Sequence, residues 1–443
     1  MKKSYFLIFG ILLVVVLILV GPVRERFFQT RIVAPINSNS LNALGAPKIV
    51  ASGINTYGYH AVSTAPDGNS IAVWVAFSDS TLFGQLFDPK GNPVGGPFKI
   101  DDERTNGADS PSVFMSSLGK FVVVWVPQGS VSQGTRQIFK RSFLPGLTSQ
   151  SAPLPQGAKV AITSNKSMAY SNPSVDGDPS TGMYAIAYNG QPAPGQPVGQ
   201  ADVYMRMYSF NNNQGTTEIK VNNNADNGLT FQHSPTVDVN NGKILIAWQT
   251  KLDTSAYAKV ILYDGSVVLQ DIGSKVNLTP PAAPGKSSYG RLNGVLSTDG
   301  SFLLVGGTGE KSDAQYVTPN GVLKPSFVVN STPIVRGYNI VSGNYNNDRV
   351  RRTAVLTFPS GITLMTWSDG KDIKAQLFDS NLSRLGNEFK ITSTGSGESA
   401  PTLHLLSHNT VMVTWLGGPT FYAQPFQLNS AGLGVSGPVL EEN

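Results

Sequence analysis

The chain has no cysteine, only four histidines, and few charged residues, which make up 14% of its 443 positions. Without cysteine there can be no disulfide framework and no thiolate chemistry. The histidines, His60, His233, His404 and His408, do not show the spacing of a metal site. No glycine-rich phosphate loop precedes a helical pattern, which argues against nucleotide chemistry. We therefore expect neither a metal nor a cofactor.

Glycine, with 46 copies, and proline, with 29, are abundant, which is typical of many short strands joined by turns. One motif recurs along the chain, in which a glycine turn leads into an apolar run that ends in tryptophan, as in LGKFVVVWV from Leu118 to Val126. The residues at its last aromatic position are Trp74, Trp125, Tyr188, Trp248, Trp367 and Trp415. A seventh copy has Gly306 there. We expect these aromatic side chains to fill the space between repeated units.

Each repeat contains four strand patterns. The first is short and often reads Pro-x-Val, as in SPSV at Ser110, and a tight turn follows it. The second is apolar on both faces and therefore buried on both. The third alternates, as in IKAQLF up to Phe378, and the fourth carries a lysine. Seven units of about 50 to 60 residues predict an all-β fold, a seven-bladed β-propeller of four-stranded blades.

The propeller is expected to span residues 47–443. Its blades are predicted at about 59–104, 105–165, 166–224, 225–280, 281–331, 332–393 and 394–443. Residues 47–51, PKIVA, look like a fourth strand without the three that should precede it. We predict that they complete the last blade and close the ring.

The amino-terminal region is different in character. Residues 5–23 form an uninterrupted apolar stretch that, as a helix, would extend about 28 Å, close to the thickness of a bilayer core. A cleaved signal peptide is the alternative, but bulky and charged residues follow the stretch where a cleavage site needs small ones. We predict a short tail at 1–4, one transmembrane anchor at 5–23 and a stalk or linker at 24–46. Basic residues stand on both sides of this stretch, so the positive-inside rule gives little preference for either orientation in the membrane. We nevertheless expect the propeller to lie outside the cytoplasm.

The net charge of +5 raises the possibility of a nucleic-acid partner. Many lysines, however, occupy one repeat position in the fourth strand, where lysine discourages edge-to-edge pairing of sheets. They are Lys48, Lys99, Lys159, Lys220, Lys275 and Lys390. Lysines spread around a rim do not form the clustered stripe that DNA binding requires, so we expect no nucleic-acid partner.

Candidate binding residues lie just before the first strands, where a propeller would bring them to the mouth of its channel. They are Tyr57, Asp109, Tyr170, His233, Arg291, Arg351 and Glu398. Aromatic rings beside charged groups suit a sugar or a peptide, although polar residues that merely cap hydrated strand ends would look the same. Catalysis on a glycoside would need two carboxyls roughly 5 to 10 Å apart, for which Asp109 and Glu398 are the candidates. Arginines near residue 351 are candidates for a sialidase-like carboxylate site.

The blade pattern, Pro-x-Val, then G-x-F-V-V-V-W, then A-Q-L-F-D, then G-x-x-F-K-I, resembles the propeller repeats of large secreted and surface-displayed bacterial proteins. This resemblance covers nearly all of the chain beyond residue 46. It implies a surface-presented, non-catalytic module for adhesion or protein interaction, held by a membrane anchor. A carbohydrate-active enzyme and a structural component of a larger assembly are the alternatives.

Overall fold

Seven antiparallel sheets make up the part of the chain that this computed structural model describes, which lies between residues 41 and 429. Outside the description are residues 1–40, 55–59, 77, 79–80, 102–107, 128–135, 147–151, 164, 166, 193–200, 212–214, 223–231, 251–255, 263–273, 277–291, 307–310, 332–352, 393–396 and 430–443. Contacts divide the chain into two units, Met1–Ala34 and Pro35–Asn443, and every described residue belongs to the second.

The sheets follow one another along the chain, and each is one blade. Blade 1 contains β3 (His60–Thr64), β4 (Ser70–Val75), β5 (Leu82–Phe87) and β6 (Pro93–Lys99). Blade 2 contains β7 (Ala108–Met115), β8 (Phe121–Pro127), β9 (Phe139–Leu144) and a divided outer strand, β10 (Leu154–Pro155) and β11 (Val160–Ala161). Blade 3 contains β12 (Met168–Asp178), β13 (Met183–Pro192), β14 (Asp202–Ser209) and β15 (Ile219–Lys220).

The remaining blades repeat this order. Blade 4 contains β16 (Gln232–Asn240), β17 (Lys243–Thr250), β18 (Ala256–Leu262) and β19 (Ser274–Val276). Blade 5 contains β20 (Asn293–Leu296), β21 (Phe302–Gly306), β22 (Asp313–Val317) and β23 (Phe327–Val328). Blade 6 contains β24 (Ala354–Thr357), β25 (Thr363–Ser368), β26 (Ile373–Phe378) and β27 (Arg384–Lys390). Blade 7 contains β28 (Glu398–Ser407), β29 (Thr410–Gly417) and β30 (Thr420–Leu428), with β1 (Leu41–Ala43) and β2 (Lys48–Ser52) on its outer edge.

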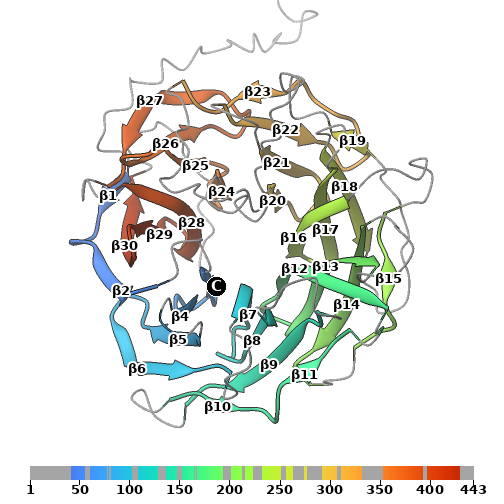
Figure 1. Cartoon of the computed structure of the whole chain (residues 1–443). Coiled ribbons are helices and arrows are strands. Elements are labelled where there is room, and N and C mark those ends of the chain that lie inside the picture. Colours follow the sequence, from blue (N-terminus) through green and yellow to red (C-terminus); the bar gives the residue numbers. More distant parts are fainter. Residues whose placement is uncertain are drawn as a thin grey trace, which may run out of the picture. The chain divides into compact units, whose positions relative to one another are not determined.

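The blades form a ring with their first strands innermost (Figure 1). The predicted seven-bladed β-propeller of four-stranded blades is therefore confirmed. The second strand of every blade lies between two neighbours of its own sheet and packs against the adjacent blades. This is why its sequence is apolar on both faces.

The repeated tryptophans lie at the junctions between blades. Trp125, Trp367 and Trp415 are fully buried. In five blades the aromatic side chain stacks on an aromatic residue directly opposite on the third strand, with ring centroids 5.6 to 6.3 Å apart. Each junction between neighbouring blades has its own cluster of buried apolar side chains. Stability is thus spread around the ring, and the junctions depend on one another through its closure.

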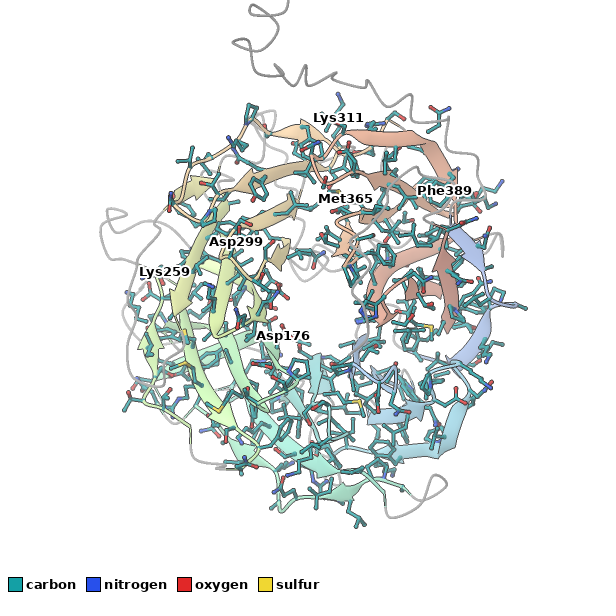
Figure 2. The ribbon with its side chains drawn as sticks, turned by 180° about the vertical axis from the view of Figure 1, so that it is seen from behind. Asp176, Lys259, Asp299, Lys311, Met365 and Phe389 are labelled. Atoms are coloured by element: carbon teal, nitrogen blue, oxygen red, sulfur yellow. The ribbon has the colours of Figure 1, made fainter. Side chains whose placement is uncertain are left out.

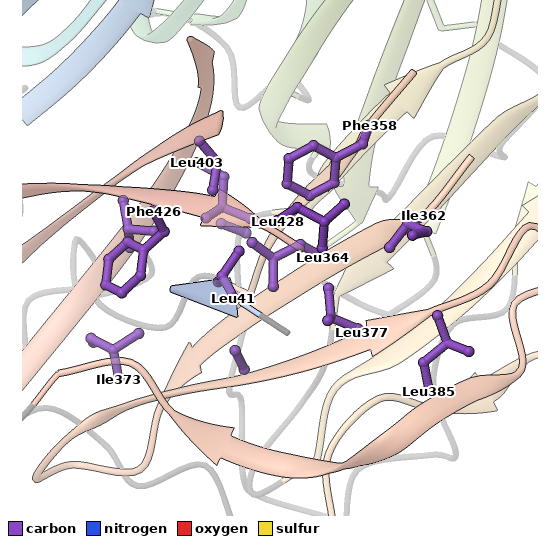
Figure 3. Packing of buried hydrophobic residues seen from close by; sticks show 14 of the residues in the cluster. Leu41, Phe358, Ile362, Leu364, Ile373, Leu377, Leu385, Leu403, Phe426 and Leu428 are labelled. Atoms are coloured by element: carbon purple, nitrogen blue, oxygen red, sulfur yellow. The ribbon is translucent and has the colours of Figure 1, made fainter. Parts of the chain in front are cut away.

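Blade 7 is completed from the amino-terminal side. β1 and β2 both pair antiparallel with β30, at Leu428 to Phe426 and at Ala423 to Thr420 respectively. Leu41 lies among the buried side chains of blades 6 and 7 (Figure 3). The sequence predicts a linker up to residue 46. In the structure, residues 41–43 pair with β30 and bury Leu41, so they belong to the propeller.

A glutamine in the third strand of two blades hydrogen-bonds to the bulge in the neighbouring fourth strand, a role that its sequence position alone does not reveal. In blade 6 the amide nitrogen of Gln376 donates to the carbonyls of Leu385 and Gly386, where the pairing between β26 and β27 is interrupted by a bulge. Gln85 does the same in blade 1, toward Val94 and Gly95. The bulge leaves strand carbonyls without ladder partners, and the glutamine satisfies them.

No helix among the described residues is long and apolar enough to cross a bilayer. The anchor predicted at residues 5–23 lies outside the described part of the chain.

Candidate functional site

A cavity of about 360 Å³ lies along the centre of the ring, lined by residues from the first strands of all seven blades. Its lining consists mostly of small and apolar side chains, because seven strand edges converge there. Among the lining residues that the structure describes, the charged or titratable ones are Asp176, Asp238 and His404. Figure 2 shows Asp176 beside the central opening, seen from behind. These three residues define the channel site.

Side chains of the first strands link blades 1 to 6, each to the next, around this cavity. Ser63 accepts a hydrogen bond from the backbone N–H of Met115 (3.0 Å), and Ser112 accepts one from that of Val175 (3.1 Å). Asn293 donates in the same direction, to the carbonyl oxygen of Thr353 (2.6 Å). The polar residues of the first strands therefore satisfy backbone groups at the inner edges of neighbouring sheets.

The two aspartates of the channel site take part in this linkage. Oδ2 of Asp176 accepts the N–H of Val239 (2.8 Å), and Oδ2 of Asp238 accepts the N–H of Leu296 (2.5 Å). Their carboxyl groups also hydrogen-bond to each other, which requires a proton on one of them. The pair therefore joins blades 3, 4 and 5.

Both carboxyls are partly exposed to the cavity and enclosed by protein on their other sides. Burial, together with the nearby charge of Asp238, raises the pKa of Asp176 well above its usual value. Burial also raises the pKa of Asp238, to about 6, against the lowering effect of the Leu296 N–H. Two carboxylates this close repel each other, so the pair favours a shared proton.

His404, on β28, is the third titratable residue of the channel site. Its Nε2 lies 2.8 Å from Oγ1 of Thr402, which in turn lies 2.5 Å from Oγ1 of Thr414. Burial lowers the pKa of His404 to about 4. The imidazole is therefore neutral at pH 7 and supplies no positive charge to the channel.

The residues predicted for the channel mouth lie upstream of this site. In blades 2, 3, 4 and 7 a bulge interrupts the pairing of the first strand just before the lining begins. The residue before the proline there has a positive φ, as in Ser110 (57°) and Asn172 (52°). Asp109, Tyr170, His233 and Glu398 precede these bulges, and the two whose side chains are described, Tyr170 and Glu398, do not line the cavity.

The two predicted residues whose side chains are described are both buried. Tyr170 packs edge-on against Tyr188, with ring centroids 5.8 Å apart. Burial, with the charge of Glu218, raises the pKa of Tyr170 to about 12. Glu398 is fully buried, and its Oε2 accepts the N–H of Ile373 (3.2 Å) in blade 6.

The structure places the other predicted residues less completely. Asp109 pairs with Val126 and His233 with Gln249 through the backbone, and their side chains are outside the description. Tyr57, Arg291 and Arg351 lie outside the described residues altogether.

The sequence reasoning missed Asp176 and Asp238. Both directly follow the Pro-x-Val motif, in NPSVD and SPTVD, so they occupy one position in consecutive repeats. Tyr170 precedes Asp176 by six residues, or roughly 20 Å of extended chain. The charged groups of the described channel therefore lie toward the tight-turn ends of the first strands, away from the ends that carry the residues predicted for the channel mouth.

The described residues include no group of three or more histidine or acidic side chains that could hold a metal ion. Several fourth-strand lysines have polar partners: Lys159 pairs with Asp101 (2.9 Å), Lys220 with Asp202 (2.7 Å) and Lys390 with Asp372 (2.7 Å). These charges are balanced locally along the outer edge.

No protein-family model matches the chain, and no curated protein matches it. Solved structures are similar in fold. A protein of unknown function from Dyadobacter fermentans is 13% identical, with a TM-score of 0.46 over 73% of this chain and 95% of that one. A mutant NanB sialidase from Streptococcus pneumoniae is 9% identical, with a TM-score of 0.49 over 82% and 84%. The α-L-arabinanase of Penicillium chrysogenum is 9% identical, with a TM-score of 0.47 over 76% and 99%. These similarities concern the fold alone.

Proposed function

We propose that this chain is a non-catalytic interaction module, a propeller that presents recognition loops for adhesion or for binding a protein or glycan. One observation carries the proposal. Three described acidic side chains that could serve acid–base chemistry at the channel, Asp176, Asp238 and Glu398, each accept a backbone N–H from a neighbouring blade. A carboxylate engaged in this way stabilises the ring, and moving Asp176 or Asp238 toward a substrate would take the acceptor away from the N–H of Val239 or Leu296.

The binding surface in this proposal is the set of loops between second and third strands. The described loop from β25 to β26 shows how such a loop is held: Asp369 accepts the N–H groups of Lys371 and Asp372, and Ser368 donates to the carbonyl of Glu398. Blade 7 thus braces a loop of blade 6. A loop fixed at its base presents its tip with little loss of entropy on binding.

The proposal includes a membrane anchor at residues 5–23, with the propeller outside the cytoplasm. Its basis is the length of the apolar stretch and the charged residues that follow it. Alkaline extraction of membranes that carry the full chain tests this. Retention in the membrane pellet supports the anchor, and complete release overturns it.

A carbohydrate-active enzyme is the second candidate, and the partly exposed acid pair in a cavity is the observation that favours it. The geometry argues against it. Retaining and inverting glycosidases separate their carboxyls by about 5 Å or more, whereas Asp176 and Asp238 are hydrogen-bonded.

Lysine cross-linking with mass spectrometry on the full chain, in its native membrane or particle, tests the proposed function. Lys311 and Lys371 report on the loop face, and Lys99 and Lys390 report on the rim. Links from the loop face to a different protein support an interaction module. Links confined to the rim favour a packed structural component.

If no cross-link to another protein is found, a glycan is the next candidate ligand. The full chain is then tested on a glycan array and on a panel of fluorogenic glycosides. Turnover that disappears in a folded Asp238→Asn variant would establish the enzyme and overturn the proposal. Binding without turnover, retained in that variant, supports it.

A further inference from the structure

The ring is closed by a segment that belongs to no complete blade of its own. Residues 41–54, here called the strap, precede blade 1 in sequence and pair with β30 of blade 7. The strap also reaches both neighbouring junctions, since Leu41 is buried between blades 6 and 7, and Ile54 between blades 7 and 1. Blade 7 is therefore completed only by non-covalent contacts to the strap.

The strap carries the same recognition features as the fourth strands of blades 1 and 6. Its Gly45 has a φ of 112°, and Gly95 and Gly386 also have positive φ, at 67° and 71°. Each of these glycines follows a branched apolar residue and is followed within four residues by the lysine of the outer strand, in NALGAPKIV, NPVGGPFKI and SRLGNEFKI.

In all three blades a glutamine of the third strand donates to the bulge that this glycine allows. In blade 7 it is Gln424, whose amide nitrogen donates to the carbonyl of Gly45. Pro425 beside it has no N–H, so β30 cannot continue an ordinary ladder there, and its carbonyl instead accepts the N–H of Leu44 (2.8 Å). The edge of β30 therefore discriminates among strands, because only a glycine fits opposite this site without backbone strain.

Side-chain anchors complete the recognition. Ile54 is 1% exposed and Leu41 6% exposed, whereas Ile49 in the same strap is 61% exposed. Nζ of Lys48 contacts the turn after β5, at the Gly91 carbonyl (3.1 Å) and the Asn92 side chain (2.7 Å). All of these contacts are non-covalent, so none of them requires the strap and β30 to belong to the same copy of the chain.

We propose that the outer edge of β30 is a strand-acceptor site specific for the strap sequence, and that the strap of a second copy of this chain can occupy it. The partner is an extended segment with a buried apolar residue at each end and a glycine bulge between them. Such an exchange joins two copies by the same contacts that close one ring. It goes beyond the proposed function because it links copies of the chain to one another.

The absence of cysteine makes a direct test possible in the full chain. Asn42 of β1 lies opposite Gln427 of β30, and both side chains are exposed. One preparation carries Asn42→Cys and a second, differently tagged, carries Gln427→Cys. Paired positions in an antiparallel ladder meet the distance that a disulfide requires. After the two are mixed, mild oxidation should give a disulfide-linked heterodimer only where a strap has crossed between copies.

Asn42→Cys mixed with Ser407→Cys, an exposed position of β28, is the matched control. We expect a heterodimer yield at least about tenfold above that control, rising with protein concentration. A yield equal to the control at every concentration overturns the proposal.

Synthetic peptides of residues 41–54 test the specificity. The unaltered peptide and its Ile49→Ala variant should suppress the heterodimer at similar concentrations. Gly45→Val and Ile54→Ala peptides should need at least about tenfold more, because the first strains the bulge and the second loses the buried anchor. Equal suppression by all four peptides would show general strand addition and overturn the specific site.

Discussion

Replacing Asp238 with asparagine should make the propeller more stable at pH 7 to 8 and leave it nearly unchanged at pH 4. In the native chain Asp238 is the first of the two carboxyls to ionise as the pH rises, and its ionisation places a negative charge at the enclosed junction of blades 3 and 4. An asparagine at 238 donates to Asp176 permanently through its amide nitrogen. Its oxygen can still accept the N–H of Leu296, so the link to blade 5 is retained.

The sign and size of the effect follow from the pKa of Asp238, which rises from 3.8 to about 6 on folding. A group with a raised pKa in the folded state contributes stability below its unfolded pKa, and this contribution is lost as pH rises through the folded value. The shift corresponds to about 3 kcal/mol, at about 1.4 kcal/mol for each pKa unit. Because both carboxyls are partly exposed to the channel, we expect a gain of about 1 to 3 kcal/mol for the variant at pH 8.

The assay is denaturant unfolding of the full chain at several pH values between 4 and 8, followed by tryptophan fluorescence. Asp178→Asn is the matched control, since Asp178 lies on β12, the strand of Asp176, beside an exposed turn. Burial tends to raise the pKa of Asp178, but hydrogen bonds from Ser180 and Thr181 outweigh it and the pKa is lowered. That residue contributes stability above about pH 4 that is lost on acidification, so its removal should have the opposite pH dependence. If Asp238→Asn unfolds with the same pH slope as the native chain, the assignment of a raised pKa to Asp238 is refuted.

Three further changes probe the scaffold. Trp125→Ala should lower the free energy of unfolding by about 3 to 5 kcal/mol through lost burial and a cavity, and a loss below about 1 kcal/mol in denaturant melts would contradict the role of the repeated aromatic position. Gly386→Ala should cost about 1 kcal/mol, because its φ is 71°, whereas Gly96→Ala, with open space around the added carbon, should be nearly neutral in the same melts. Glu398→Ala should cost about 1 to 3 kcal/mol, because it empties a fully buried site and leaves the Ile373 N–H with Oγ1 of Thr392 as its remaining acceptor among the described residues; unchanged stability with altered ligand binding would instead restore Glu398 to a functional site.

Strand periodicity and repetition are properties of local sequence, and this is why the architecture could be predicted. The run from Phe121 to Val126 is apolar at every position, as a strand buried on both faces must be, and its copies at regular spacing implied blades. One side-chain position in the repeat, marked by Trp125 and its equivalents, correctly predicted the packing between blades.

The candidate site could not be predicted in the same way, because it depends on where separate blades meet. Asp176 and Asp238 are far apart in sequence and come together only because the first strands of blades 3 and 4 are neighbours at the centre of the ring. Glu398 has the carboxyl group and the sequence position expected of a catalytic residue at the channel mouth. In the structure it precedes a bulge in β28 and is fully buried. Gln424 and Gly45 likewise meet only when the ring closes. The sequence by itself thus determined the repeating strands and their buried faces, since these follow from local periodicity. Only the tertiary structure decided which polar groups lie together and which of them remain open to a ligand, since closing the ring brings distant segments into contact and removes them from water.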